Sequence, residues 1–187
     1  MDPFNSLAGQ FLIAMPGMGD PDFSRGVTLV CQHNEEGAIG LLVNRLAAFT
    51  MGDVLEQMQL PCERDDIREL PVLHGGPVQT ERGFVLHDGA RSWDASFRID
   101  AQWAVTTSRD ILVATAAGEG PEHFMMALGY AGWGAGQLDE EIKANAWLTA
   151  QADSRIVFQT PIEQRWSAAA GLAGVDIARL AGYAGHA

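Results

Sequence analysis

Basic residues are scarce in this chain of 187 residues, and their scarcity weighs against two classes of partner. Twelve Lys and Arg residues stand against 24 Asp and Glu residues, which gives a formal net charge of −12 at pH 7. No run of Lys or Arg forms a positive stripe, and an acidic field repels phosphate backbones and anionic lipid surfaces. We therefore expect no direct nucleic acid binding and no membrane partner.

Cysteine is also rare. Cys31 and Cys62 form neither a CxxC motif nor a disulfide framework, and two free thiols are typical of a reducing compartment. The first six residues lack the pattern of a signal peptide, and no apolar run approaches the roughly 20 residues that a membrane helix needs. These observations favour a cytoplasmic protein.

The familiar sequence patterns of catalysis and cofactor binding are missing. The chain has no GxGxxG or GxxxxGK[ST] phosphate loop, no GxSxG elbow and no HExxH helix. Its histidines and carboxylates do not show the spacing of a structural zinc site or an EF-hand. Cys31 and His33 share one face of a predicted strand, but a small core cysteine explains that position more simply than a nucleophile does. We assign no catalytic residue, no cofactor and no metal.

Apolar residues are abundant enough for one packed core. Hydrophobic residues make up 47% of the chain and charged residues 19%. A chain of this length buries roughly 70% of its unfolded surface on folding. We predict a single domain over residues 1–187, with an Ala- and Gly-rich C-terminal tail that frays from about residue 173.

Strand patterns dominate the first half of the sequence. Two of the apolar runs flank the turn at residues 34–37 and predict a hairpin. The predicted strands are residues 10–14, 26–33, 38–44, 71–73, 83–87, 96–99 and 156–159. The apolar run at residues 124–130 fits either a helix or a strand.

Capping residues mark the predicted helices. Thr50 and Asp53 form a capping box for a short helix that ends before Pro61, and Ser108 can cap a helix that ends before Gly118. A third helix is predicted at residues 138–147, where acidic residues occupy the first turn. The strongest helix start combines an N-cap, a proline and a glutamate at residues 160–163.

Two glycine-containing segments are candidates for a binding surface. Gly75 and Gly76 let the backbone approach a ligand while His74 offers a donor or acceptor, although a tight turn explains the same residues. Tyr130 and Trp133 lie among glycines and supply large amphipathic surfaces. Trp133 belongs either to the core or, if it is exposed, to a ligand platform or a protein interface.

Two polar residues at the ends of predicted strands complete the candidate surface. Arg25 closes a loop dense in Gly and Pro, and Asn44 ends the strand at residues 38–44. Arg25 and Asn44 can each serve either to hold the backbone locally or to contact a ligand or partner. Local pairing with Asp20 or Asp22 is the simpler explanation for Arg25.

Several of these segments together resemble the YqgE/AlgH family of bacterial proteins. The similarity covers nearly the whole chain, with small departures at Gln32, where Glu is common, at Leu46, where Pro is common, and at His74, where other residues also occur. The matching stretches are residues 11–18, 33–40, 42–45, 75–78, 83–87, 129–138 and 185–187.

This resemblance implies an α+β fold in which a bent, mixed β-sheet curls into a pseudo-barrel flanked by helices. It implies no established catalytic residue, cofactor or substrate. The AlgH name implies transcriptional regulation of alginate production. Because the chain has no DNA-binding motif and a net charge of −12, we expect any link to transcription to be indirect.

Two hypotheses about function follow. The first is a cytoplasmic, non-catalytic binding or regulatory protein that recognises an unknown protein or small molecule. Its candidate surface is Arg25, Asn44, His74, Gly75, Gly76, Tyr130 and Trp133. The alternative is an enzyme whose pocket is formed by the loops from Met15 to Arg25, from His74 to Pro77 and from Gly132 to Gly136.

Overall fold

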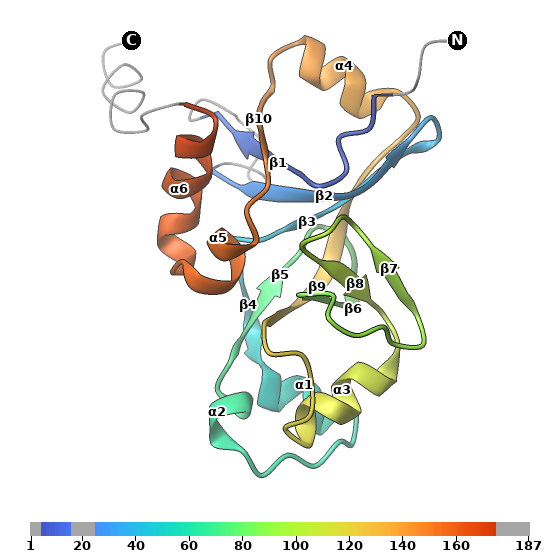
Figure 1. The fold of residues 1–187 in the computed structure, drawn as a ribbon, viewed down its shortest axis with the longest axis vertical. Coiled ribbons are helices and arrows are strands. Elements are labelled where there is room, and N and C mark those ends of the chain that lie inside the picture. The colour runs from blue at the N-terminus through green and yellow to red at the C-terminus, as the bar shows by residue number, and fades with distance from the viewer. Residues whose placement is uncertain (1–4, 16–24, 175–187) are drawn as a thin grey trace.

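A bent sheet of ten strands organises the fold in the computed structural model, which describes residues 5–15 and 25–174 (Figure 1). The strands are β1 (Gln10–Ala14), β2 (Val27–Asn34), β3 (Gly37–Leu42), β4 (Leu46–Thr50), β5 (Pro71–His74), β6 (Val78–His87), β7 (Ser96–Arg98), β8 (Ala104–Thr106), β9 (Phe124–Trp133) and β10 (Trp147–Gln151). Their main path runs β10-β1-β2-β3-β9-β6-β8-β7, while β5 pairs with β9 and β4 pairs with β5. Among the described strands, only the pairing of β5 with β9 is parallel.

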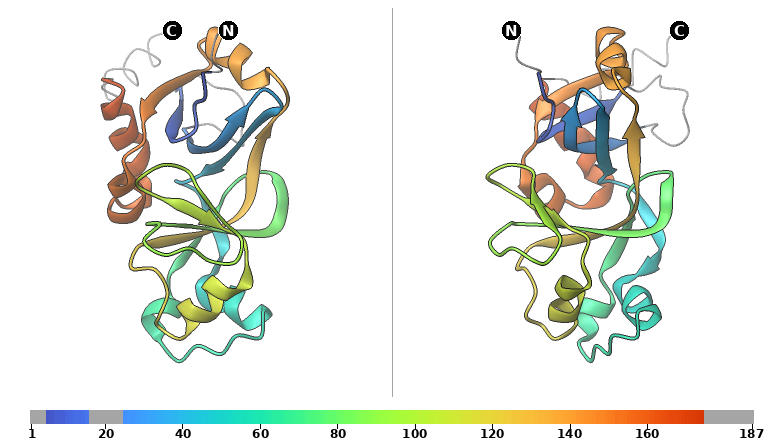
Figure 2. Two further views of the ribbon diagram at one scale, coloured as in Figure 1. Left: turned by 45° about the vertical axis from the view of Figure 1, so that its right-hand side comes forward. Right: turned by 90° about the vertical axis from the view of Figure 1, so that its right-hand side faces the viewer.

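Short helices flank this sheet. They are α1 (Met51–Gln57), α2 (Asp65–Arg68), α3 (Arg109–Ala116), α4 (Gln137–Lys143), α5 (Ser154–Gln159) and α6 (Arg165–Leu172), with a 3₁₀ turn at Ile162–Gln164. The turned views show α1, α2 and α3 at one end of the molecule and α4 at the other (Figure 2). The predicted α+β class, with a curled mixed sheet flanked by helices, is confirmed. In the described part of the chain, no helix is both long and apolar enough to cross a membrane.

Strand β9 connects the two halves of the molecule. Its first half pairs with β6 on one side and β5 on the other, and its last residues pair with β3. Gly129 has a φ of +77°, a conformation that favours glycine, and it lies where the strand passes close to the backbone of Gly76. The ambiguous run at residues 124–130 is therefore a strand, and it continues to Trp133.

Three clusters of buried side chains form the core. The largest lies between β1, β2, β3 and helices α5 and α6, and it includes Phe11, Leu29 and Trp103. A second joins α1 and α3 to β5, β6 and β9, and a third packs α4 against β1, β9 and β10. The two smaller clusters hold the helices at opposite ends of the molecule.

Local signals predicted several elements correctly. Thr50 and Asp53 form the expected reciprocal capping box at the start of α1, because the backbone N–H of Thr50 donates to Asp53 Oδ2 (2.9 Å) and that of Asp53 donates to Thr50 Oγ1 (3.3 Å). The β2–β3 hairpin and the helix that follows Ser108 also form where predicted.

Other predictions were wrong. The segment expected as a strand at residues 156–159 belongs to α5, because Asp153 accepts a hydrogen bond from the backbone N–H of Arg155 (3.0 Å) and starts a helix. The helix expected to reach Trp147 ends at Lys143, and Asn145 with a φ of +58° turns the chain into β10. The helix expected from residue 160 begins as a 3₁₀ turn and becomes α6 only at Arg165.

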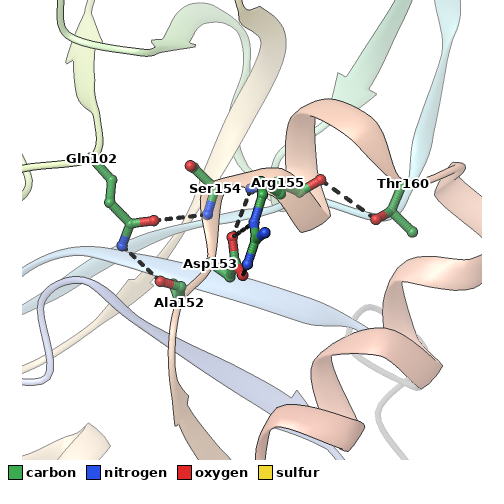
Figure 3. A network of polar contacts seen from close by, with 6 residues as sticks. All are labelled: Gln102, Ala152, Asp153, Ser154, Arg155 and Thr160. Carbon is green, nitrogen blue, oxygen red and sulfur yellow. Dashed lines mark hydrogen bonds and ion pairs between the residues drawn. The ribbon is translucent and has the colours of Figure 1, made fainter.

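Gln102 joins the loop between β7 and β8 to the start of α5 (Figure 3). Its Nε2 donates to the carbonyl oxygen of Ala152 (2.8 Å), and its Oε1 accepts from the backbone N–H of Ser154 (3.0 Å). Arg155 and Asp153 form an ion pair beside it, with 2.8 Å between Nη2 and Oδ2. One amide side chain therefore connects segments about 50 residues apart.

Candidate functional site

The predicted glycine loop approaches the protein itself. A Cβ atom added to Gly75 would collide with the carbonyl oxygen of Gly129, and one added to Gly76 would collide with the backbone of Tyr130. Gly75 also donates to the carbonyl oxygen of Leu128 (2.8 Å) and accepts from Leu42 (2.8 Å). The tight-turn interpretation accounts for both glycines, since β9 occupies the space that they leave.

Trp133 is buried, with 7% of its surface exposed. Its indole N–H donates to Glu141 Oε1 (3.3 Å), and the same oxygen accepts from the indole of Trp147 (3.0 Å). The two rings meet edge to face with centroids 6.4 Å apart. Trp133 thus fixes α4 against β9 and β10, which supports the core interpretation of this residue.

Tyr130, His74 and Asn44 are also engaged within the fold. Tyr130 packs edge to face on Phe84, with ring centroids 5.7 Å apart, and His74 is half-buried at the end of β5. Asn44 Oδ1 accepts from the backbone N–H of Val27 (2.8 Å), and its Nδ2 donates to the carbonyl oxygen of Arg25 (2.9 Å). Asn44 therefore closes the start of β2.

Of two hollows among the described residues, neither combines residues from more than one loop of the alternative enzyme hypothesis. Arg25 lies with its guanidinium carbon 5.4 Å from the centre of the Trp166 ring, in the half of the molecule that holds α6. Residues 16–24 of the first loop lie outside the described residues. A hollow of about 200 Å³ beside the β2–β3 hairpin includes Trp133 but neither Arg25 nor residues 74–77.

A larger groove, of about 620 Å³, lies between α1 and α3 over strands β6 and β9. Its floor is apolar and its rim is polar. The floor consists of Val54, Met58, Val85, Leu112, Met126 and Leu128. The rim consists of the exposed residues Asp53, Gln57, Thr80, Glu81, Thr107 and Arg109.

The local sequence explains how this floor forms. Val85 and Met126 are partners in the antiparallel β6–β9 ladder, and a Cβ on the neighbouring Gly83 would collide with Met126 Cε. Glycine at position 83 therefore leaves room for the methionine side chain. Methionine is flexible and polarisable, and such side chains adapt to ligands of different shape.

Contacts between the walls set the shape of the groove. Arg109 Nη2 donates to the carbonyl oxygen of Met58 (3.2 Å), so the first residue of α3 is tied to the end of α1. Ser108 donates to Asp110 Oδ1 (2.5 Å), and the other oxygen of Asp110 accepts from the backbone N–H of Asp94 (2.8 Å). These bonds hold the start of α3, and the pKa of Asp110 lies below its usual range.

A buried polar network lies behind the groove. Thr106 lines the groove, and its Oγ1 lies 2.8 Å from His87 Nε2 and 2.6 Å from Ser96 Oγ. His87 Nδ1 accepts from the backbone N–H of Gly89 (3.2 Å), so the neutral ring carries its hydrogen on Nε2 and donates to Thr106. Burial lowers the pKa of His87, and the ring is neutral at pH 7.

The groove lining lacks the side chains that most often serve as nucleophiles or zinc ligands. It includes neither histidine nor cysteine, and the Ser108 hydroxyl is already committed to Asp110. Cys31 lies elsewhere, in the core, where burial raises the pKa of its thiol to about 12. Across residues 5–15 and 25–174, no group of three or more His, Cys, Asp or Glu side chains is arranged to hold a metal ion. The groove is suited to binding apolar surface.

Comparison with known proteins decides the family. The model of the AlgH-like family matches residues 11–178, which is most of the chain and includes both walls of the groove. The chain belongs to the AlgH-like family. The resemblance seen in the sequence is thereby confirmed.

Relatives within the AlgH-like family match over almost their full length. A UPF0301 protein of Xanthomonas campestris pv. campestris (strain B100) is 55% identical over 181 residues, which cover 97% of this chain and 96% of the relative. A UPF0301 protein of Xanthomonas oryzae pv. oryzae (strain PXO99A) is also 55% identical, with the same coverage.

Solved structures give the same result for the fold. The solution structure of the AlgH protein from Pseudomonas aeruginosa has a TM-score of 0.81 at 44% identity, and the match covers 97% of this chain and 96% of that chain. A crystal structure of a Corynebacterium diphtheriae protein has a TM-score of 0.69 at 21% identity and covers 90% of this chain and 87% of that one. The second likeness concerns the fold alone.

The residues that line the groove were missed by sequence reasoning. They come from four separate segments of an AlgH-like chain. The sequence predicted a helix in two of them, a strand at residues 83–87 and a helix or strand at residues 124–130, but no pattern brought the four together. One signal was present in the sequence, because the apolar Phe49 directly precedes the capping box. In the structure this side chain is 52% exposed.

Proposed function

We propose that this chain is a non-catalytic binding protein whose binding surface is the groove between α1 and α3. The observation that carries the proposal is the combination of an apolar floor with an exposed polar rim in a volume of about 620 Å³. Ligand sites commonly have volumes of about 300–1,000 Å³ and this division of apolar and polar groups. This surface replaces the glycine loops as our preferred place of recognition.

The cellular setting is part of the same proposal. Cys31 and Cys62 are both buried free thiols, and they belong to different core clusters. Free thiols are typical of a reducing compartment, so we place the protein in the cytoplasm. A role in transcription, if the AlgH name of the Pseudomonas relative extends to this chain, would act through a bound partner, because a net charge of −12 opposes contact with DNA.

Fragment binding observed by NMR tests the groove directly. Small apolar fragments are titrated into the isotope-labelled full chain, and we expect the largest shift changes at Val54, Leu112 and Met126. The Val54→Glu substitution places a charge in the groove and should weaken fragment binding about tenfold. Thr80→Arg at the exposed rim is a second variant that leaves the core intact.

Val113→Glu is the matched control, because Val113 lies on α3, is exposed and does not line the groove. It should leave fragment binding unchanged. Each variant is first checked for an unchanged thermal unfolding midpoint. Fragment shifts that cluster away from the groove, or equal effects of Val54→Glu and Val113→Glu, would contradict the proposal.

A further inference from the structure

We infer that the groove receives an apolar segment of a protein partner that carries a basic residue, and that Glu81 pairs with this basic residue. The inference rests on the proposed function and adds the chemistry of the occupant. Three features of the described residues lead to it: the exposed apolar side chains of β4, the open edge of that strand, and the excess of carboxylates at the rim of the groove.

The apolar surface extends beyond the groove. Phe49 lines the groove and is 52% exposed, and Leu46 on the same strand is 60% exposed. Both residues belong to β4 and stand three positions apart, so exposed apolar side chains occur on that strand beyond the groove as well as in it. A small molecule that fills the groove would leave Leu46 uncovered, whereas an extended peptide segment can run along β4 past both residues.

Strand β4 also offers an edge. Among the described strands it pairs with β5 alone, and four of its five residues are exposed. Exposed strand edges are places where an extended segment of another chain adds by main-chain hydrogen bonds. The groove and this edge lie next to each other, because Phe49 belongs to both.

The charged residues that line the groove are Asp53, Glu81 and Arg109, so the carboxylates outnumber the cation by two to one. Asp53 Oδ2 is held by the backbone N–H of Thr50, and the guanidinium of Arg109 is held by the carbonyl oxygen of Met58. Glu81 is exposed and has no hydrogen-bond or ion-pair partner within residues 5–15 and 25–174. The neighbouring Arg82 lies over the ring of Phe84 instead, with its guanidinium carbon 5.2 Å from the ring centre.

The overall charge points to the same class of partner. A net charge of −12 attracts a basic segment and steers its encounter with the protein. A second copy of this chain would bring the same acidic charge to the interface, so self-association is disfavoured. A basic, apolar segment complements both the floor of the groove and its free carboxylate.

The test uses pairs of fluorescent peptides with the full chain. Short peptides are first selected from a random library on the immobilised protein, and each binder is then synthesised with its basic residues kept or replaced by Glu. We expect the basic form to bind at least about fivefold more tightly than the acidic form, as measured by fluorescence anisotropy at low salt. Added salt should reduce this preference.

Reversing the charge at position 81 tests whether Glu81 is the residue that pairs with the basic peptide. Glu81→Lys should abolish the preference for the basic peptide or reverse it. Glu35→Lys is the matched control, because Glu35 is an exposed carboxylate in the β2–β3 turn and its substitution changes the net charge by the same amount. It should leave most of the preference intact. Both positions are exposed, and unchanged unfolding midpoints would show that both variants fold.

The outcomes separate this inference from the proposed function. If apolar fragments bind the groove but no selected peptide does, the protein-segment inference is overturned and the binding function stands. Equal affinity for basic and acidic peptides, or equal effects of Glu81→Lys and Glu35→Lys, would overturn the role of Glu81. If neither fragments nor peptides bind, the proposed function fails as well.

Discussion

Arg109 on α3 donates a hydrogen bond to the carbonyl oxygen of Met58 at the end of α1, with 3.2 Å between the two atoms. This bond is a direct polar link between the two walls of the groove. Hydrophobic packing beneath the groove holds the same two helices together through Leu55 on α1 and Ile111 on α3. The Arg109–Met58 bond therefore affects the separation of the two helices at the open side of the groove, while the core packing maintains the fold.

Removing this link should loosen the end of α1. In Arg109→Ala we expect local opening near Met58 to become easier by about 1 kcal/mol, or roughly fivefold, because one side-chain hydrogen bond is lost. Hydrogen exchange of the Leu60 amide, which donates to the carbonyl oxygen of Leu55, measures the effect. Arg155→Ala, at the distant start of α5, is the control and should leave exchange at Leu60 unchanged.

Three glycines should respond differently to alanine. Gly76→Ala should lower the free energy of unfolding by more than about 2 kcal/mol, because its φ is +156° and the added Cβ would collide with Tyr130. Gly136→Ala should cost about 1 kcal/mol, since its φ is +72° but the space around it is open. Gly171→Ala should raise the free energy of unfolding by roughly 0.5–1 kcal/mol, because Gly171 lies within α6 and has open space around it.

Urea denaturation of the three variants measures this order. Similar losses in Gly76→Ala and Gly136→Ala would contradict the close approach of the Gly76 backbone to β9.

Glu141 should be important for stability because one of its oxygens accepts from the indoles of both Trp133 and Trp147. We expect Glu141→Ala to lower the free energy of unfolding by about 2 kcal/mol, as hydrogen bonds to a charged acceptor typically contribute about 1.5–3 kcal/mol. Glu141→Gln keeps an acceptor and should recover part of the loss.

The control on the same helix is Glu140→Ala. Glu140 is exposed and lies 3.5 Å from Lys143, and such surface pairs contribute little. Tryptophan fluorescence during chemical denaturation measures the free energy of unfolding of all three variants. An equal response of Glu140→Ala and Glu141→Ala would show that the shared acceptor is unimportant.

His87 should make stability depend on pH. Burial lowers its folded-state pKa below the usual 6.5, so the unfolded chain binds a proton more readily than the folded one. The stabilising contribution is complete above the unfolded-state pKa and is lost as the pH falls below it toward the folded-state pKa. The free energy of unfolding should therefore be lower at about pH 5 than at about pH 7.

His87→Gln separates this effect from the carboxylates that also titrate in acid. The variant should show a smaller fall in stability between the two pH values than the parent chain does. Protonation also removes the acceptor for Gly89, so the amide signal of Gly89 in NMR spectra should shift as His87 titrates in the folded chain. A fall in stability that is unchanged in His87→Gln would exclude His87 as its source.

Elements that local chemistry specifies could be predicted from the sequence. The capping box of Thr50 and Asp53 and the hairpin turn at residues 34–37 involve residues a few positions apart, so their geometry is fixed nearby. The resemblance to the YqgE/AlgH family then supplied the sheet architecture. Trp133 was left open between core and surface, and its burial depends on Glu141 and Trp147, which sequence spacing alone does not bring together.

Other parts of the fold depend on distant segments. Trp147 lies in β10 because that strand pairs with β1, more than 130 residues earlier in the chain. Ile156 and Val157 have strong strand propensity, but the Asp153 cap and the core place them in a short helix. The groove is the clearest case, because Val54, Leu112 and Met126 become neighbours only when β9 is in place.

The late position of β9 has a consequence for synthesis on the ribosome. Strands β3, β5 and β6 all emerge before residues 124–133, yet each uses β9 as a partner. The nascent chain therefore holds three strands with unpaired edges until about two-thirds of it has been made. During that interval its exposed strand edges would be open to aggregation or to capture by chaperones, and the arrival of a single strand ends this vulnerability in both halves at once.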